Sequence, residues 1–353
     1  MVEWKKIGDV CSFNRGKTIT AKNAVDGDIP VIAGGQNPSY YHNESNRTGE
    51  SITVAGSGAY AGFVAYWNKP IFVSDAFTVD PSDKLLHKYL FQWLKMNQTK
   101  ILATQKGAGV PHVHGKDIAN FLIPIPSLEE QNRIVGILDT FTYSIENLKQ
   151  QIAQRRKQFE FYRDQLLFSF KQNAIVSEVS TFAKGRIDAK CLNAENYVSV
   201  ENLLKDKAGK TISSVVPTEG NWVMYKENDI LIGNIRPYLR KIWFSDRCGG
   251  TNGDVLVIRP NEKVIPRYLF FVLSSERFFI YYNQTAKGGK MPRGEKARAL
   301  QFDFYLPSTK EQSRIVSILD TFEASISNLE AQLAQRQKQY EYYRNKLLTF
   351  EGG

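Results

Sequence analysis

The amino-acid sequence predicts an α+β protein in which two globular α/β segments alternate with two long helices, arranged as a pseudo-twofold repeat. Three observations predict this fold. Residues 127–168 and 308–349 repeat each other at an offset of 181, and 26 of the 42 paired positions are identical. Their apolar residues recur at alternating steps of four and three, which is typical of a helix with a seam for a partner helix. The other two segments contain short apolar runs bounded by Gly, Pro or Asp, as strands do.

Charge divides the chain in the same way. The 353 residues carry a net charge of +10 and a pI near 9.3, which favours a polyanionic partner. Residues 1–126 hold an excess of +3 and residues 171–307 an excess of +7, whereas the two repeated stretches are neutral. We therefore expect four segments: globular 1–126, helical 127–170, globular 171–307 and helical 308–350.

Both helices have a start signal and a seam. Ser127 and Ser308 each precede a Glu by three residues, which predicts capping boxes with Glu130 and Glu311. Arg155 and Arg336 occupy seam positions, where each guanidinium either reaches solvent or sets the register of the pair. The predicted seam comprises Ile134, Leu138, Phe141, Ile145, Leu148, Ile152, Arg155, Phe159, Ile315, Leu319, Phe322, Ile326, Leu329, Leu333, Arg336 and Tyr340.

The globular segments have patterns of both strands and helices. Alternating or continuous apolar runs between turn residues predict strands, and longer apolar-periodic stretches predict helices. We expect strands at 51–54, 71–73, 229–232 and 254–258, and helices at 84–94 and 266–273.

Basic residues cluster with glycine and proline in both globular segments, as in a DNA-binding surface. Residues 286–298 hold five basic residues and one acidic one, with glycines that allow close approach to a phosphate. Arg236 and Arg240 flank Pro237 and suit guanine edges. The candidate DNA-binding residues are Arg15, Lys17, Tyr60, Lys106, His112, His114, Lys116, Lys184, Arg186, Arg236, Tyr238, Arg240, Lys287, Lys290, Arg293, Lys296 and Arg298.

The doubled motif Glu-Gln-x-Arg-Ile-Val-x-Ile-Leu-Asp, at 130–139 and 311–320, follows Pro-Ser at each helix start. Lys-Gly stretches precede it at 106–111 and 287–292. With these features the whole chain resembles the specificity (S) subunit of type I restriction-modification enzymes.

That resemblance implies two target recognition domains, at 1–126 and 171–307, and an antiparallel pair of coiled-coil helices that acts as a spacer between them. It implies two DNA methyltransferase (M) subunits and two restriction/translocase (R) subunits as partners, with double-stranded DNA as the ligand. S-adenosylmethionine, ATP and Mg are then expected on the partner subunits, with no cofactor and no metal in this chain.

Alternative functions match the sequence poorly. Gly16-Lys17-Thr18 lacks the first glycine of a P-loop, and Asn37-Pro38-Ser39-Tyr40 lacks the second proline of an amino-methyltransferase loop. A self-contained DNA adenine methyltransferase or single-chain restriction enzyme is the alternative, and a coiled-coil scaffold without DNA affinity is a third. His112 and His114 lack a nearby third metal ligand. Three scattered cysteines and no apolar leader favour the cytoplasm. The failed enzyme motifs and the basic globular segments favour a non-catalytic, sequence-specific DNA-binding protein.

Overall fold

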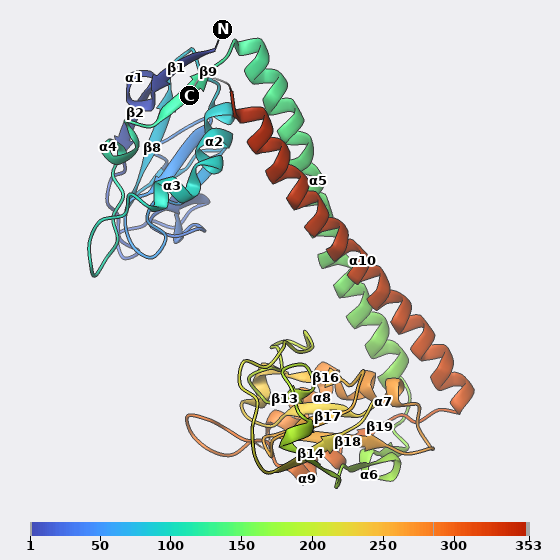
Figure 1. Ribbon diagram of the computed structural model, residues 1–353. Helices are drawn as coiled ribbons and strands as arrows, with labels where there is room; N and C mark the ends of the chain where they lie inside the picture. The colour runs from blue at the N-terminus through green and yellow to red at the C-terminus, as the bar shows by residue number, and fades with distance from the viewer. Residues whose placement is uncertain (1, 285, 351–353) are drawn as a thin grey trace. The chain divides into compact units, whose positions relative to one another are not determined.

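The computed structural model describes residues 2–284 and 286–350. They form two compact units, Met1–Gln150 with Glu330–Gly353, called unit 1, and Gln151–Leu329, called unit 2 (Figure 1). Two long helices, α5 (Leu128–Phe168) and α10 (Thr309–Leu348), each contribute one part to unit 1 and one part to unit 2. No helix in the described ranges is long and apolar enough to cross a membrane.

Unit 1 is built on a four-stranded antiparallel sheet of order β2-β8-β5-β6. A smaller sheet, β4-β3-β7, joins β3 and β7 in parallel, and β1 pairs with β9. The elements are β1 (Glu3–Lys6), α1 (Ile7–Val10), β2 (Cys11–Arg15), β3 (Ile29–Ile32), β4 (Tyr40–His42), β5 (Ser51–Ala55), β6 (Val64–Trp67), β7 (Phe72–Val73), β8 (Ala76–Pro81), α2 (His87–Met96), α3 (Gln98–Leu102), α4 (Gly115–Ile118) and β9 (Leu122–Ile125).

Unit 2 repeats the order of the main sheet, but its second sheet has four strands instead of three. Its main sheet is β11-β18-β15-β16, its second sheet is β12-β14-β17-β13 with β13 and β17 parallel, and β10 pairs with β19. The elements are β10 (Ala174–Ile175), α6 (Val176–Val179), β11 (Ser180–Phe182), β12 (Arg186–Asp188), η1 (Ala189–Cys191), β13 (Tyr197–Val198), β14 (Asn221–Tyr225), β15 (Ile230–Gly233), η2 (Pro237–Leu239), β16 (Ile242–Phe244), β17 (Gly249–Thr251), β18 (Val255–Pro260), α7 (Pro266–Leu273), α8 (Glu276–Gln284), α9 (Lys296–Leu300) and β19 (Asp303–Phe304).

The mixed α/β character expected of both globular segments is confirmed. The four expected strands correspond to β5, β7, β15 and β18, and the helix expected at 266–273 is α7. The helix expected at 84–94 begins only at His87, because Leu86 is extended and donates its N–H to the side chain of Gln131 at 2.9 Å. In each unit the first long helix after the main sheet, α2 or α7, buries its apolar face in the same core as that sheet.

The starts of α5 and α10 are capped on one side only. The N–H groups of Glu130 and Glu311 donate to the hydroxyls of Ser127 and Ser308 at 3.3 and 3.4 Å, as expected. The two carboxylates bind Arg133 and Arg314 in the next turn instead of closing the box. These exposed pairs complement the helix N-terminus.

The glutamine of the repeated motif fastens each helix to its unit. Gln131 and Gln312 are fully buried, and their Oε1 atoms accept the N–H groups of Leu86 and Ile265 at 2.9 and 2.8 Å. Their Nε2 atoms donate to the carbonyls of Pro126 and Pro307. Each glutamine therefore satisfies backbone groups just ahead of α2 or α7 that would otherwise be buried without partners. The motif repeats because the same junction is built twice.

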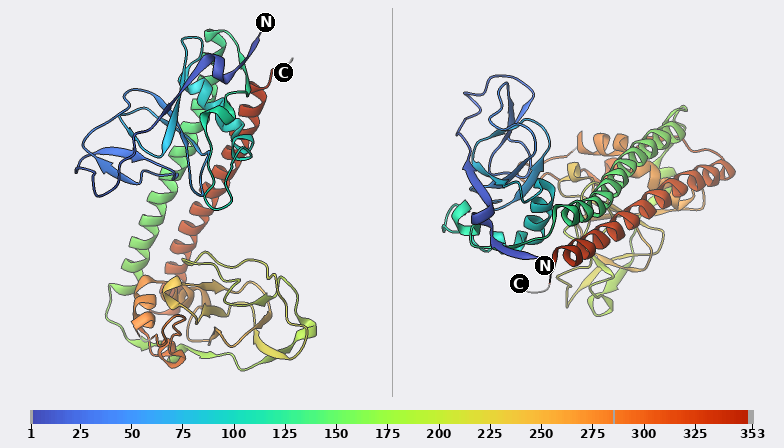
Figure 2. Two further views of the ribbon diagram at one scale, coloured as in Figure 1. Left: turned by 90° about the vertical axis from the view of Figure 1, so that its left-hand side faces the viewer. Right: turned by 90° about the horizontal axis from the view of Figure 1, so that it is seen from above.

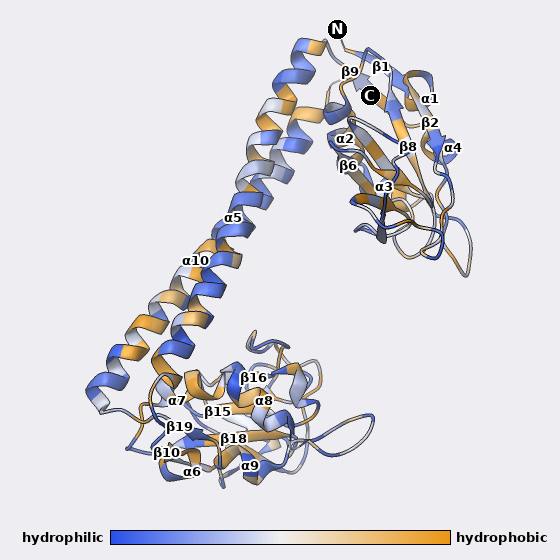
Figure 3. Ribbon diagram, turned by 180° about the vertical axis from the view of Figure 1, so that it is seen from behind, coloured by the Kyte–Doolittle hydropathy of each residue, from blue (hydrophilic) through white to orange (hydrophobic). Residues whose placement is uncertain are grey.

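The two long helices run antiparallel in each unit. In unit 1, Ile134 and Leu138 near the start of α5 share a core with Leu348 at the end of α10. In unit 2, Leu167 near the end of α5 shares a core with Ile315 near the start of α10. Figure 2 shows the helices side by side, and Figure 3 shows hydrophobic and hydrophilic residues interspersed along both. Every predicted seam residue is buried or half-buried, whereas Tyr143 beside the seam is 75% exposed.

Candidate DNA interface

A turn and a hairpin meet at one end of the main sheet in unit 1. The turn, residues 56–62, follows β5, and the hairpin spans residues 106–112. Lys106 and His112 exchange both backbone hydrogen bonds, at 3.0 and 2.8 Å, and Gly107 at φ +107° allows the chain to reverse. The N–H of Gly58 donates to the carbonyl of Pro111 at 3.0 Å, so the two loops are joined through their backbones.

Unit 2 builds the same arrangement from different residues. The turn, residues 234–240, follows β15, and the hairpin spans residues 287–293. Lys287 and Arg293 exchange backbone hydrogen bonds at 2.9 Å each, with Gly288 at φ +109°. The N–H of Arg236 donates to the carbonyl of Pro292 at 2.7 Å, in the place of the Gly58–Pro111 bond. Tyr60 and Tyr238 occupy matching positions in the two turns and are 48% and 51% exposed.

The turns differ at the positions that need left-handed backbone. Gly58 and Gly62 adopt φ +85° and +88° in unit 1, and Arg236 and Arg240 adopt φ +51° and +50° in unit 2. A left-handed arginine costs about 1–2 kcal/mol relative to its ordinary conformation. In the case of Arg240, salt bridges to Asp206 and Glu276 help to offset that cost.

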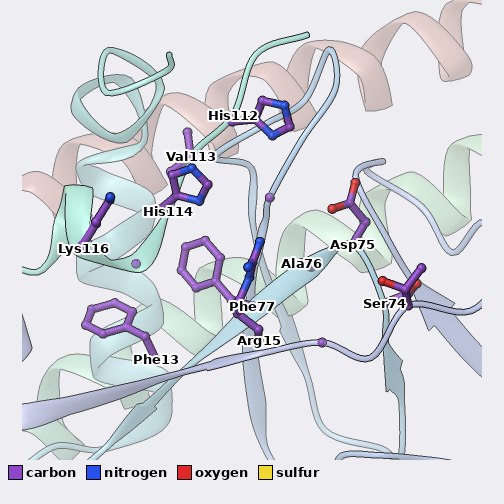
Figure 4. Close-up of a pocket in the computed structure, with 14 residues that line it drawn as sticks. Phe13, Arg15, Ser74, Asp75, Ala76, Phe77, His112, Val113, His114 and Lys116 are labelled. Carbon is purple, nitrogen blue, oxygen red and sulfur yellow. The ribbon is translucent and has the colours of Figure 1, made fainter. Parts of the chain in front are cut away.

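A pocket of about 670 Å³ lies beside the unit 1 loops (Figure 4). Phe13 and Phe77 contribute aromatic surface, and Asp75 lines the pocket between β7 and β8. The structure brings four of the predicted DNA-binding residues together in its lining: Arg15, His112, His114 and Lys116.

A second pocket, of about 390 Å³, lies beside the unit 2 loops. Arg236 and Lys241 line it together with Glu201 and Asp254, and Met291 from the hairpin also contributes. In the described part of the chain the Nε of Arg236 is buried without a hydrogen-bond partner. Basic and acidic groups therefore share both pockets.

The seventeen predicted DNA-binding residues are mostly at the surface. All are exposed except His114, Arg236 and Arg240, which are half-buried. Lys106 donates to Asp117, and this hydrogen bond lowers the pKa of that carboxyl. Lys184, Arg186 and Arg298 line neither pocket: Lys184 precedes β12, Arg186 begins it, and Arg298 lies on α9.

Besides Lys106, three of the predicted cations are engaged within the protein. Arg240 binds Asp206 and Glu276, Arg293 donates to Asp254 at 3.0 Å, and Lys296 donates to the carbonyl of Gly253 at 3.0 Å. Arg293 remains 60% exposed, so it can still face a ligand, whereas Arg240 is 35% exposed.

Sequence reasoning selected almost only cations and missed the carboxylates of this surface. Asp75 and Asp254 each stand immediately before the long strand of the main sheet, β8 or β18. An Asp directly before a long apolar strand in both globular segments was the sequence pattern that could have indicated them. The rings of His112 and His114 lie 6.2 Å apart, and no group of three or more potential metal ligands occurs among the described residues.

The chain matches the family model of the type I restriction modification DNA specificity domain twice, over residues 1–155 and 172–337. It is 26% identical over 388 residues to the EcoR124I/EcoR124II specificity subunit of Escherichia coli, covering 99% of this chain and 94% of that protein. It is 25% identical to the MjaVIII specificity subunit of Methanocaldococcus jannaschii, covering 84% and 78% of the two chains.

The fold is similar to two solved structures. The S subunit from M. genitalium has a TM-score of 0.67 at 18% identity, covering 99% of this chain and 97% of that one. A chain from a type I restriction-modification complex has a TM-score of 0.57 at 17% identity, covering 99% and 98%. The chain belongs to the family of type I restriction-modification DNA specificity proteins.

Proposed function

We propose that the chain is the non-catalytic DNA specificity subunit of a type I restriction-modification complex and that each unit reads one half of a bipartite DNA target. The observation that carries the proposal is the doubled turn-and-hairpin site, built once on each unit from the basic segments of the sequence. Two separate basic sites on one chain suit a target with two separate half-sites.

The role of each cation would depend on its surroundings: exposed lysines would bind phosphates, and cations beside a pocket would face base edges or phosphates. Exposed lysines such as Lys287 and Lys290 would neutralise phosphates, which fixes position without reading sequence. Arg236 and Arg293, which lie beside the unit 2 pocket, would face base edges or phosphates there. His112, His114, Arg15 and Lys116 would do the same in unit 1.

The partners would supply the chemistry. Type I specificity subunits assemble with methyltransferase and restriction subunits, and we propose two of each, since the long-helix motif and its junction occur twice in this chain. S-adenosylmethionine, ATP and Mg would bind those partners, and the complex would work in the cytoplasm. The exposed face of α5 and α10, including Tyr143, remains available for docking.

Exchanging residues 1–126 for the matching segment of another family member tests whether each unit reads its half-site independently. Genomic DNA methylated in cells that hold the chimera and the methyltransferase subunit is sequenced for its modified motif. One half-site should change and the other should persist. A chimera with both half-sites changed would refute independent reading, and purified wild-type chain that alone methylates DNA would refute the non-catalytic assignment.

A further inference from the structure

Asp75 and Asp254 occupy the same place in the two units. Each directly precedes the long strand of the main sheet, β8 in unit 1 and β18 in unit 2. The carbonyl of Asp75 accepts the N–H of Gly56 at 3.1 Å, and the carbonyl of Asp254 accepts the N–H of Asn234 at 2.8 Å. Gly56 and Asn234 begin the two matching turns, so the backbone places both carboxylates equivalently.

The side chains of Asp75 and Asp254 have different hydrogen-bond partners, but both are accessible to solvent. The Oδ2 atom of Asp75 accepts from the hydroxyl of Ser57, whereas the Oδ1 atom of Asp254 accepts from Arg293. Asp75 is exposed, and the side chain of Asp254 is 36% exposed. Within residues 2–284 and 286–350, the second oxygen of each carboxylate has no hydrogen-bond partner. What the two sites have in common is therefore an accessible acceptor.

A carboxylate at either position is unfavourable for DNA binding unless it makes a contact of its own with the DNA. Asp75 shares its pocket with Arg15, His112 and Lys116, and Asp254 shares its pocket with Arg236 and Lys241. A negative charge on a surface that meets phosphates weakens binding to every DNA sequence. A need to hold one particular cation does not explain both carboxylates, because the hydrogen-bond partner of the Asp75 side chain is Ser57. An acceptor-only group can instead discriminate among base edges, since amino groups donate there.

We propose that Asp75 and Asp254 are specificity-determining residues, each accepting a hydrogen bond from the exocyclic amino group of a cytosine or an adenine in the major groove of its half-site. This inference rests on the proposed function and deepens it. Cytosine N4 and adenine N6 are the major-groove donors. Each carboxylate would fix which strand carries the amino group at one base pair. The neighbouring cations would hold the phosphates on either side.

Methylation profiling of Asp75→Ala and Asp254→Ala variants tests the inference in the assembled complex. Asp75→Ala should relax one position of one half-site, and Asp254→Ala should relax one position of the other. Asp83→Ala and Glu262→Ala are the matched controls. They remove the same charge from exposed positions after β8 and β18, about 20 Å of strand away, and should leave the motif unchanged.

Base analogues show whether the amino group is the ligand. At the relaxed position, 2-pyrimidinone replaces cytosine or purine replaces adenine, each removing only the exocyclic amino group. Wild-type complex should lose about 10- to 100-fold in binding to the matching analogue, while the alanine variant should show no further loss. The analogue that has an effect also identifies the base.

The unaffected half-site is an internal control for folding. If Asp75→Ala keeps both half-sites and the wild-type ratio of specific to non-specific binding, or if wild type tolerates both analogues, the inference is overturned. A variant that relaxes every position alike would place the carboxylates in loop support and would also overturn it. If wild type itself shows no bipartite motif, the proposed function fails instead.

Discussion

The guanidinium carbon of Arg336 lies 5.7 Å from the centre of the Phe141 ring in unit 1. The relationship recurs in unit 2, where Arg155 lies 5.9 Å from the ring of Phe322. Each phenylalanine ring also stacks on a tyrosine ring. The ring centres of Phe141 and Tyr343 lie 5.3 Å apart, and those of Phe322 and Tyr162 lie 5.5 Å apart. The two polar seam positions are therefore occupied by half-buried cations packed on aromatic rings, and neither guanidinium simply points to solvent.

The contact between Arg336 and Phe141 should be measurable as a coupling energy. In a double-mutant cycle with Arg336→Met and Phe141→Leu, urea unfolding should give about 0.5–1 kcal/mol of coupling, since a partly desolvated cation–π pair is worth that much. Lys338→Met is the control, because Lys338 is exposed in the same stretch of α10. If Lys338→Met showed the same coupling energy with Phe141→Leu, the effect would come from the lost charge and not from the contact with the ring.

The helices were the most predictable part of the fold. A repeated apolar seam and a Ser-Glu start encode each helix locally, so its bounds agree with the structure within one or two residues. The repeated order of strands was not predictable, because many apolar sequences fit a buried strand equally well and the halves have diverged. The conserved feature is the backbone pairing, such as the parallel β3–β7 and β13–β17 pairs, which no residue pattern reports.

The candidate site was predicted only in part, for a related reason. Clustered cations stand out in the sequence, and the structure brings Arg15, His112, His114 and Lys116 to one pocket. The partners of Arg240 lie 34 and 36 residues away, at Asp206 and Glu276, so its intramolecular role depends on tertiary structure. Asp75 and Asp254 become recognisable as equivalents only through their backbone hydrogen bonds.

Lys287 and Lys290 should account for a measurable part of the salt dependence of DNA binding. Both are exposed on the unit 2 hairpin, and replacing both by Gln should reduce the slope of log K against log salt by about 1.8, if each lysine neutralises one phosphate. Lys263→Gln with Lys310→Gln removes the same charge from exposed positions after β18 and at the start of α10. An equal change in slope for this control would assign the effect to net charge.

Asp117 should make the hairpin junction of unit 1 sensitive to acid. Lys106 donates to its carboxylate and holds the pKa below its ordinary value, and the N–H of His114 also donates to it at 3.0 Å. Because the folded pKa is lowered, this stabilisation is present above the unfolded pKa of about 4 and is lost as the pH decreases through the folded value.

The variant Asp117→Asn should therefore unfold more readily than wild type at pH 7, by about 0.5 kcal/mol, since Lys106 is 67% exposed and water screens the pair. The difference in the free energy of unfolding should shrink towards pH 3. Urea unfolding at both pH values measures it, and Lys106→Gln should behave in the same way. A difference that is independent of pH would show that the loss concerns the shape of the side chain and not its charge.

The last prediction concerns the length of the two long helices. If α5 and α10 set the number of unread base pairs between half-sites, lengthening both should lengthen that spacer. We would insert one heptad between Gln150 and Gln151 and another between Leu329 and Glu330, where the chain passes from one unit to the other. These points interrupt neither the Phe141 contacts of unit 1 nor the Phe322 contacts of unit 2, and seven residues preserve the phase of the seam.

Each insertion adds about 10 Å of helix, which corresponds to about 3 base pairs for helices that lie along the duplex. Three base pairs also rotate one half-site by about 100° relative to the other, so the complex must twist to engage both, and affinity should decrease. Methylation profiling should then report the same two half-sites with a spacer two or three base pairs longer. A four-residue insertion at the same points is the control, because it shifts the seam out of phase and should abolish modification. An unaltered spacer in the heptad variant would mean that the methyltransferase subunits set the distance between half-sites.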